Sequence, residues 1–132
     1  MNAILRGLMK RNEDTGWVDL PLSSADMVWD FTTSGGHARA RRTGSLVELS
    51  ILNLRSKGVV QRKESKITTG LPERMRPSKA VFAPVLAVPS SGSMMGGGLK
   101  VYPDGVVTIE PLATHETYVP AYGIFAQVTY LV

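Results

Sequence analysis

The sequence predicts an all-β domain, either an antiparallel β-sandwich or a jelly-roll-like barrel, that follows a short N-terminal arm. About seven to nine short runs with apolar side chains follow one another at intervals of roughly 8–12 residues, and turn-forming residues separate them. Residues 37–56 contain two such runs on either side of a Thr-Gly-Ser turn, which indicates a β-hairpin. A second hairpin signal, Tyr-Pro-Asp-Gly, stands at residues 102–105.

The length of 132 residues fits one domain, and a domain of this size buries roughly two-thirds of its unfolded surface. We expect an arm over residues 1–15 and a single β-domain over residues 16–132. The chain has no cysteine, which excludes disulfides and thiolate chemistry. No apolar run approaches the ~18 residues of a membrane-spanning helix, and the N-terminus lacks the apolar core of a signal peptide. We therefore expect no membrane insertion, and assembly in a cytoplasm.

The arm carries an apolar stripe at helical spacing, formed by Ile4, Leu5, Leu8 and Met9. A helix this short is marginal in water unless it docks on another surface. Two interpretations stay open: the stripe attaches the domain to a larger assembly, or the segment is a frayed terminus. The four apolar residues are the candidate attachment residues.

The first strands of the domain are predicted from short alternating segments. Residues 17–20, followed by Pro21, indicate an edge strand, because proline cannot donate a hydrogen bond to a central ladder. Residues 26–33 alternate well enough for a strand, and the Gly35-Gly36 pair then predicts a turn.

The first hairpin is the clearest element. In its first strand His37, Arg39 and Arg41 share one face, while Ala38 and Ala40 lie on the other. In its second strand apolar side chains alternate with Glu and Ser, as in a half-buried strand, and the apolar residues are Val47, Leu49 and Ile51. Ser56, Lys57 and Gly58 end this unit.

The middle of the chain is less regular. A weaker strand is expected at about residues 65–69, and an irregular crossing follows between two prolines. Residues 80–88 form a continuous apolar run, which predicts a buried strand, and Pro84 within it implies an edge position or a bulge. Residues 89–98 are rich in Ser, Gly and Met and are predicted to form a loop.

The last part of the chain contains the second hairpin, with strands at residues 99–102 and 106–110. Two prolines and a glycine in residues 111–123 predict another extended loop. The closing run, residues 124–131, has few charges on either face. Burial on both faces is therefore expected, either in the domain core or between subunits.

The net charge of +4 is unevenly distributed. Residues 37–79 contain eleven Lys or Arg and three acidic residues, a local net charge of +8. This segment either attracts an acidic partner, or forms a solvated face, or is one half of a contact between subunits. Binding to phosphates is the main alternative, but the segment contains no Phe, Tyr or Trp on which bases could stack. We therefore do not expect nucleic acid as a partner.

Catalytic and metal-binding motifs are not found in the sequence. His37 and His115 are the two histidines, and they do not supply the three or four ligands of a zinc site. The serines of residues 90–93 lack the frame of a hydrolase nucleophile, and the glycines at 96–98 lack the spacing of a phosphate-binding loop. We expect no enzymatic activity, no cofactor and no metal.

Four motifs in order carry a resemblance to a known family. They are GWVDLPL from residue 16, RRTGSLVELSI from residue 41, LPERMRPS from residue 71 and VYPDGVVTI from residue 101, before a closing apolar strand. This order resembles the small C-terminal β-domains of tailed-bacteriophage tail-fibre, minor tail and receptor-binding proteins. Those domains follow a long fibre shaft, whereas here about fifteen residues precede the domain. We expect these residues to attach it.

The resemblance implies a virion structural protein displayed on the particle surface. It implies a homotrimer that binds through exposed loops or clefts between subunits, with other virion proteins and a host surface receptor as partners. The protein is then either a tail-associated adhesion domain or a capsid decoration protein. Residues 89–98 and 111–123 are the candidate distal loops, and Tyr118 and Tyr122 are the candidate surface-binding residues. The alternative function is a basic β-barrel that binds nucleic acid.

Overall fold

The computed structural model describes residues 14–32, 35–61, 63–89, 94–112 and 123–132. In this part the chain forms nine strands, which all pair antiparallel, and one short 3₁₀ helix. The elements are β1 (Val18–Asp19), β2 (Trp29–Phe31), β3 (His37–Thr43), β4 (Leu46–Ser56), β5 (Ser65–Thr68), η1 (Glu73–Met75), β6 (Val81–Val88), β7 (Met95–Val101), β8 (Val107–Pro111) and β9 (Gly123–Leu131). The predicted all-β, antiparallel class is confirmed.

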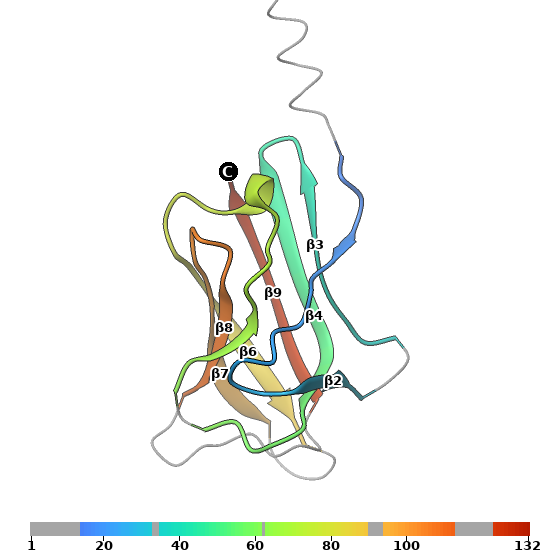
Figure 1. Cartoon of the computed structure of the whole chain (residues 1–132), viewed down its shortest axis with the longest axis vertical. Coiled ribbons are helices and arrows are strands. Elements are labelled where there is room, and N and C mark those ends of the chain that lie inside the picture. Colours follow the sequence, from blue (N-terminus) through green and yellow to red (C-terminus); the bar gives the residue numbers. More distant parts are fainter. Residues whose placement is uncertain (1–13, 33–34, 62, 90–93, 113–122) are drawn as a thin grey trace, which may run out of the picture.

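The strands form one curled sheet in the order β1-β3-β4-β9-β6-β7-β8-β5, and β2 pairs with the last residues of β4 (Figure 1). The segment between β1 and β2 joins the two ends of this order. Leu20 N donates to the carbonyl of Ala38 on β3 (2.9 Å), and Ser23 N donates to the carbonyl of Ile67 on β5 (2.7 Å). These contacts close the curled sheet into a barrel-like shape.

The predicted first hairpin is β3–β4, paired from His37↔Leu52 to Thr43↔Leu46. Ala38 and Ala40 point into the core and are almost completely buried, while the basic residues of β3 face outward. β4 is the longest strand, and its pairing with β9 shifts register between Ile51 and Leu54. Asn53 has a φ of 53° at this shift, as in a β-bulge. The bulge bends β4 and lets it turn with the curl of the sheet.

The core lies inside the curled sheet and is formed by the inward-facing side chains of the strands. η1 closes one end of it, and Tyr130 on β9 donates its hydroxyl to the carbonyl of Met75 (2.7 Å), so the buried phenol is satisfied. Burial raises the pKa of Tyr130. The largest fully buried side chains are Val47, Leu49, Leu54, Val60, Ile67, Leu71, Met75, Leu99, Val101, Ile109 and Ile124.

The second hairpin, β7–β8, has the predicted turn. Tyr102 N donates to Val106 O (2.9 Å), and Gly105 N donates to Tyr102 O (3.0 Å). Gly105 has a φ of 90°, which glycine adopts without steric strain. Asp104 accepts the amide of Val106 (3.1 Å) through its side chain and fixes the turn.

Two strands differ from their predictions in burial. β6 lies between β7 and β9 in the order, so it is not an edge strand, although its register with β9 starts only at Val85, after Pro84. The outward side chains of β6 are exposed, with Phe82 at 66% and Leu86 at 41%. On β9 Leu131 is 72% exposed. The outward faces of β6 and β9 are therefore not buried in the core of the single chain, and burial between subunits stays a prediction. An apolar run does not tell which face another element covers.

The predicted loop at residues 89–98 is shorter than expected. Met95–Gly98 belong to β7 and pair with Pro84–Ala87 of β6. Glycines 96–98 were predicted to lie in this loop, but two neighbouring strands hold the backbone of Gly97 and Gly98 in an extended conformation. Tertiary pairing overrides the weak strand propensity of glycine here.

The barrel has two poles, at the two ends of its strands. The proximal pole contains Asp14, the β3–β4 turn, η1 and the end of β9 (Figure 1). The distal pole is the opposite one and contains β2. The register places Ser56, Val88, Met95, Pro111 and Gly123 toward the distal pole. The strand ends that flank residues 90–93 and 113–122 therefore lie at the pole opposite Asp14.

Candidate functional site

The candidate residues named from the sequence lie outside the described part of the chain. These are Ile4, Leu5, Leu8 and Met9 of the arm, and Tyr118 and Tyr122. Their roles stay predictions, as does the division of the chain into residues 1–15 and 16–132. Asp14 is the first described residue after the arm and lies at the proximal pole. Gly123 is the first described residue after Tyr122 and lies at the distal pole.

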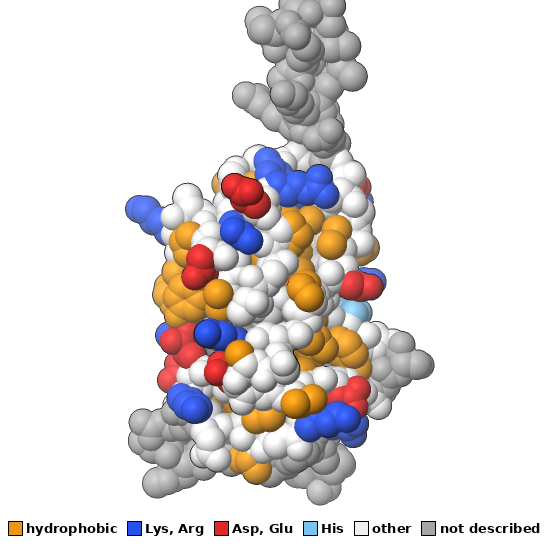
Figure 2. Space-filling model, viewed as in Figure 1, with side chains coloured by type: hydrophobic (Ala, Val, Ile, Leu, Met, Phe, Trp, Pro, Cys, Tyr) orange, Lys and Arg blue, Asp and Glu red, His pale blue; other side chains and the backbone are white. Residues whose placement is uncertain are grey.

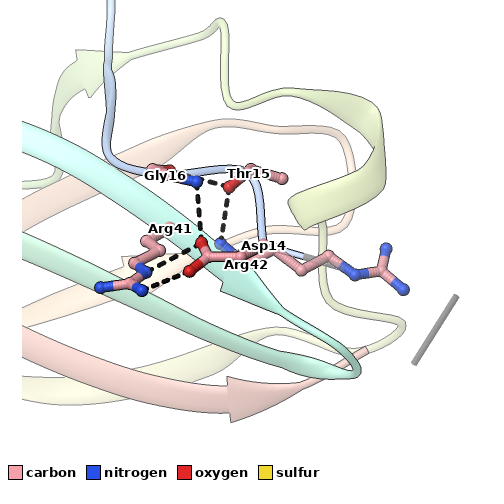
Figure 3. A network of polar contacts seen from close by, with 5 residues as sticks. All are labelled: Asp14, Thr15, Gly16, Arg41 and Arg42. Carbon is pink, nitrogen blue, oxygen red and sulfur yellow. Dashed lines mark hydrogen bonds and ion pairs between the residues drawn. The ribbon is translucent and has the colours of Figure 1, made fainter. Parts of the chain in front are cut away.

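At the proximal pole a network of polar contacts holds the residue that follows the undescribed N-terminal segment (Figure 3). The carboxylate of Asp14 accepts Arg41 Nε (3.0 Å) and, through its other oxygen, Arg41 Nη2. It also accepts the amide of Gly16 (2.8 Å). The hydrogen bond from Arg41 is the main cause that holds the pKa of Asp14 below its usual value. A carboxylate with a forked Arg partner has a defined orientation.

Thr15 and Arg42 extend this network along β3. Thr15 N donates to Arg42 O and Arg42 N donates to Thr15 Oγ1, both at 3.0 Å. The guanidinium of Arg42 then donates to the carbonyl of Gly44 (2.7 Å) and to the carbonyl of Arg74 on η1. We call residues 14–16 with Arg41 and Arg42 the proximal clasp. The clasp fixes the position and direction in which the chain enters the barrel.

The sequence contains a signal for the clasp, the Asp-Thr-Gly segment at residues 14–16, that the alternation of apolar residues does not reveal. Asp-x-Gly is typical of a turn in which the Asp side chain accepts the amide two residues on, and Gly16 has the positive φ (66°) common after such turns. The basic partners on β3 lie 27 residues away. Figure 2 shows Lys and Arg side chains gathered at this end of the molecule.

At the distal pole β2 is held on both sides. The carboxylate of Asp30 accepts hydrogen bonds from Arg55 Nη2 (3.0 Å) and from the amide of Phe31 (2.7 Å). The hydrogen bond from the Phe31 amide is the largest cause that lowers the pKa of Asp30. The indole of Trp29 donates to the carbonyl of Lys66 on β5 (2.8 Å). Side-chain contacts therefore fix β2 to both β4 and β5 at this pole.

Several large apolar side chains near the distal pole are exposed. Met94 is 65% exposed, Leu112 71% and Val28 52%. Leu112 N donates to Gly96 O (3.2 Å), which places Leu112, directly after β8, beside the start of β7. Exposed apolar groups gathered at one end of a domain are common at interaction surfaces.

A cluster of polar side chains lies on the outward side of β7 and β8. Glu64 accepts the hydroxyl of Tyr102 and that of Thr108 (2.9 Å), and Lys100 lies 3.6 Å from the same carboxylate. These groups lower the pKa of Glu64, with the Tyr102 hydrogen bond as the largest cause. The same hydrogen bond to Glu64 is the largest cause that raises the pKa of Tyr102 to about 12. Every polar group of this cluster has a partner, so it joins the end of β5 to β8 rather than presenting a reactive group.

Four of the eleven basic residues of the segment 37–79 bind groups of the domain itself. Arg41 and Arg55 bind carboxylates, and Arg42 and Arg76 donate to backbone carbonyls, the latter to Leu71 O at 2.9 Å. These four side chains thus have a structural role within the domain. His37 Nε2 lies 2.9 Å from Ser50 Oγ, and burial lowers the pKa of His37. His115 lies outside the described residues.

Among the described residues no group of three or more His, Cys, Asp or Glu is placed to hold a metal ion. Over the same ranges, none of the helical structure is long and apolar enough to span a membrane.

No protein-family model matches the chain, and no curated protein matches it either. Among solved structures, the chain is similar in fold to the head domain of the lactococcal phage bIL170, described among the receptor-binding domains of lactococcal phages. The TM-score is 0.66 at 14% sequence identity, and the match covers 88% of this chain and 96% of that domain. The chain therefore has the fold of a phage receptor-binding head domain, and the identity is too low for the likeness to show more than the fold.

Proposed function

We propose that the protein is a surface-displayed binding domain of a bacteriophage particle, and that it acts at the tail by binding a receptor on the host cell. The observation that carries the proposal is the similarity in fold to a phage receptor-binding head domain over nearly all of that domain. The motif order in the sequence supports the same class independently of the fold comparison. Such a domain acts by binding, without a cofactor or a catalytic step.

The arrangement of the poles supports this role. The clasp fixes the start of the domain at the proximal pole, while the strand ends that flank residues 90–93 and 113–122 lie at the distal pole. A domain attached at one pole presents the other pole to its surroundings. We therefore propose that residues 1–13 attach the domain and that the distal pole, with Tyr118 and Tyr122, contacts the receptor.

Two further points belong to the proposal. The protein forms a homotrimer, in which three weak sites together bind a cell surface more tightly than one. It is assembled in the host cytoplasm and is part of the virion. Capsid decoration is the other location considered, and the similarity to a receptor-binding head domain favours the tail.

The purified chain, labelled with a fluorophore, tests receptor binding directly. We expect it to bind cells of the phage host in a saturable manner and to slow adsorption of the phage when it is added in excess. The matched variants are Met94→Glu at the distal pole, which should reduce binding, and Arg74→Glu at the proximal pole, which should not. Absence of both cell binding and competition contradicts the proposal, and antibody labelling of the head instead of the tail favours decoration.

Deletion of residues 2–13 tests attachment. The deletion stops before Asp14, so the clasp is kept and the domain should fold as the full chain does. We expect particles that lack the protein although the deleted form still binds cells. Particles that carry the shortened protein at full occupancy contradict the attachment role.

A further inference from the structure

Exposed apolar side chains also stand at the proximal pole, where β4 begins and β9 ends. Leu131 is 72% exposed, and Leu46 and Val132 are each 37% exposed. Leu46 and Leu131 are direct partners in the β4–β9 pair, so their side chains lie next to each other on the same face of the sheet. Val132 N donates to Ser45 O (2.8 Å), which places Val132 beside the β3–β4 turn. We call Leu46, Leu131 and Val132 the apolar rim.

The chain enters the domain on the same row of the sheet as the apolar rim. Asp14 forms an isolated bridge with Thr43 of β3, and Thr43 pairs with Leu46 of β4. Leu46 in turn pairs with Leu131 of β9. Neighbouring strands lie about 4.8 Å apart, so the backbone of Leu131 is roughly 14 Å from that of Asp14 and the backbone of Leu46 roughly 10 Å. Because the proximal clasp holds Asp14 at this place, the segment before it starts beside the rim.

The segment before Asp14 carries apolar side chains that match the rim. Those at helical spacing are Ile4, Leu5, Leu8 and Met9. Met9 precedes Asp14 by five residues, and five residues of extended chain span roughly 16 Å. The near end of the stripe therefore reaches either leucine of the rim. A helix of this length is marginal in water unless it docks, and the rim offers an exposed apolar surface within its reach.

We propose that residues 1–13 fold back onto the proximal pole of their own domain and place the apolar stripe on the apolar rim. Contact between the two removes apolar groups of both from water. The tether at Asp14 selects this segment as the occupant, because a short tether keeps the stripe at an effective concentration in the millimolar range. A separate partner would have to bind the same small surface without that advantage.

This docking decides which side chains of the arm remain for a partner. With the stripe on the rim, Arg6 and Lys10 fall on the opposite side of a helix and point away from the domain. The surface to which the particle binds the arm should then present carboxylates. This consequence rests on the proposed attachment role, whereas the docking itself does not.

Trypsin digestion of the purified full chain tests the docking, because the arm contains the cleavage sites Arg6, Lys10 and Arg11. Cleavage of a segment that opens and closes rapidly follows the population of its open form. We expect Leu131→Asp to speed cleavage within the arm by about tenfold or more, since it removes an apolar contact and places a charge on the rim. Leu112→Asp is the matched control: Leu112 is 71% exposed but lies at the distal pole, so this variant should be cleaved at the rate of the unaltered chain.

A disulfide between engineered cysteines gives a second measurement, because the chain contains no cysteine of its own. The bond requires the two Cα atoms to approach within about 7 Å. We expect mild oxidation of the double variant Leu8→Cys with Leu131→Cys to cross-link positions within one chain. Arg6→Cys with Leu131→Cys is the control: Arg6 has the longer tether but stands opposite the stripe, so its cross-linking should be slower.

Melting temperatures close to that of the unaltered chain confirm that the variants are folded, as the exposure of Leu131 and Leu112 leads us to expect. Equal cleavage rates for the two Asp variants, or equal cross-linking from Leu8→Cys and Arg6→Cys, overturn the inference. Cross-links that join two chains assign the rim to another copy and overturn it as well. All these measurements use the free chain, so their failure leaves the attachment role to the deletion of residues 2–13 in particles.

Discussion

At Gly105 a single backbone angle decides whether the β7–β8 turn can form. Its φ of 90° lies in a region that residues with a side chain rarely adopt, and a Cβ there would lie 2.6 Å from Arg76 Nε. Its carbonyl also accepts the amide of Leu71 (3.2 Å), so the turn holds the segment before η1. The residue thus links a local turn to the proximal end of the core.

We expect Gly105→Ala to lower the free energy of unfolding by about 1–3 kcal/mol, the usual cost of a non-glycine residue in such a conformation. Urea denaturation followed by tryptophan fluorescence measures the change. Gly35→Ala is the control and should change stability by less than about 0.5 kcal/mol, because it adds a methyl group in open space. Equal stability of the Gly105 and Gly35 variants would show that the turn is not strained by a side chain.

Glu64 gives the stability of the domain a dependence on acid. Its folded pKa is lowered, first by the Tyr102 hydroxyl, so its stabilising contribution is complete above the unfolded pKa of about 4.3. The contribution is lost as the pH falls through the lowered folded pKa. Unfolding free energies measured from pH 6 to pH 3 should therefore fall more steeply for the unaltered chain than for Glu64→Gln.

Tyr102→Phe serves as the partner variant in that comparison. It removes the hydrogen bond that contributes most to the lowered pKa of Glu64, so its acid dependence should lie between those of the unaltered chain and Glu64→Gln. Parallel pH profiles for all three proteins would show that Glu64 makes no differential contribution over this range.

At the scale of elements, the proximal clasp attaches a two-residue edge strand, β1, to the hairpin of β3 and β4. A strand of two residues has few ladder hydrogen bonds of its own, so its position depends on contacts at its ends. The clasp supplies these through side chains, mainly the Asp14–Arg41 pair. An edge held in this way can loosen without unfolding of the core.

We expect Asp14→Ala to speed amide exchange at Thr15, Gly16 and Arg42, while the global stability changes little because the ion pair is exposed. Hydrogen exchange by mass spectrometry measures this locally. Asp30→Ala is the control: it breaks a similar Asp–Arg pair at the distal pole and should leave exchange at residues 14–16 unchanged. Unchanged exchange at Gly16 in the Asp14 variant contradicts the clasp.

At the scale of the whole molecule, attachment is proposed at the proximal pole and receptor binding at the distal pole. We expect Met94→Glu to bind host cells with a lower apparent affinity than the unaltered chain, because it places a charge among exposed apolar side chains at the distal pole. Titration of labelled protein on cells measures the affinity.

Arg74→Glu at the proximal pole is the control in that titration and should bind as the unaltered chain does. Equal affinity of the Met94 and Arg74 variants would mean that the exposed apolar group of the distal pole takes no part in binding.

Elements that depend on neighbouring residues were predictable from the sequence. The β3–β4 hairpin follows from strict alternation around Gly44, and the β7–β8 turn follows from Pro103 and Gly105. A period of two and a required positive φ are properties of a few consecutive residues, so they are visible without knowledge of the fold. The candidate site residues lie outside the described part, and their roles stay predictions.

What the sequence determined by itself is thus the class: antiparallel strands, two hairpins, and an edge strand before Pro21. Tertiary structure alone decided that β9 stands between β4 and β6, that residues 20–23 close the barrel, and that Asp14 meets Arg41. It also decided that no described element covers the outward side chains of β6 and β9. The physical reason is that these contacts join residues far apart in the chain, and an apolar side chain is equally suited to any partner that removes it from water.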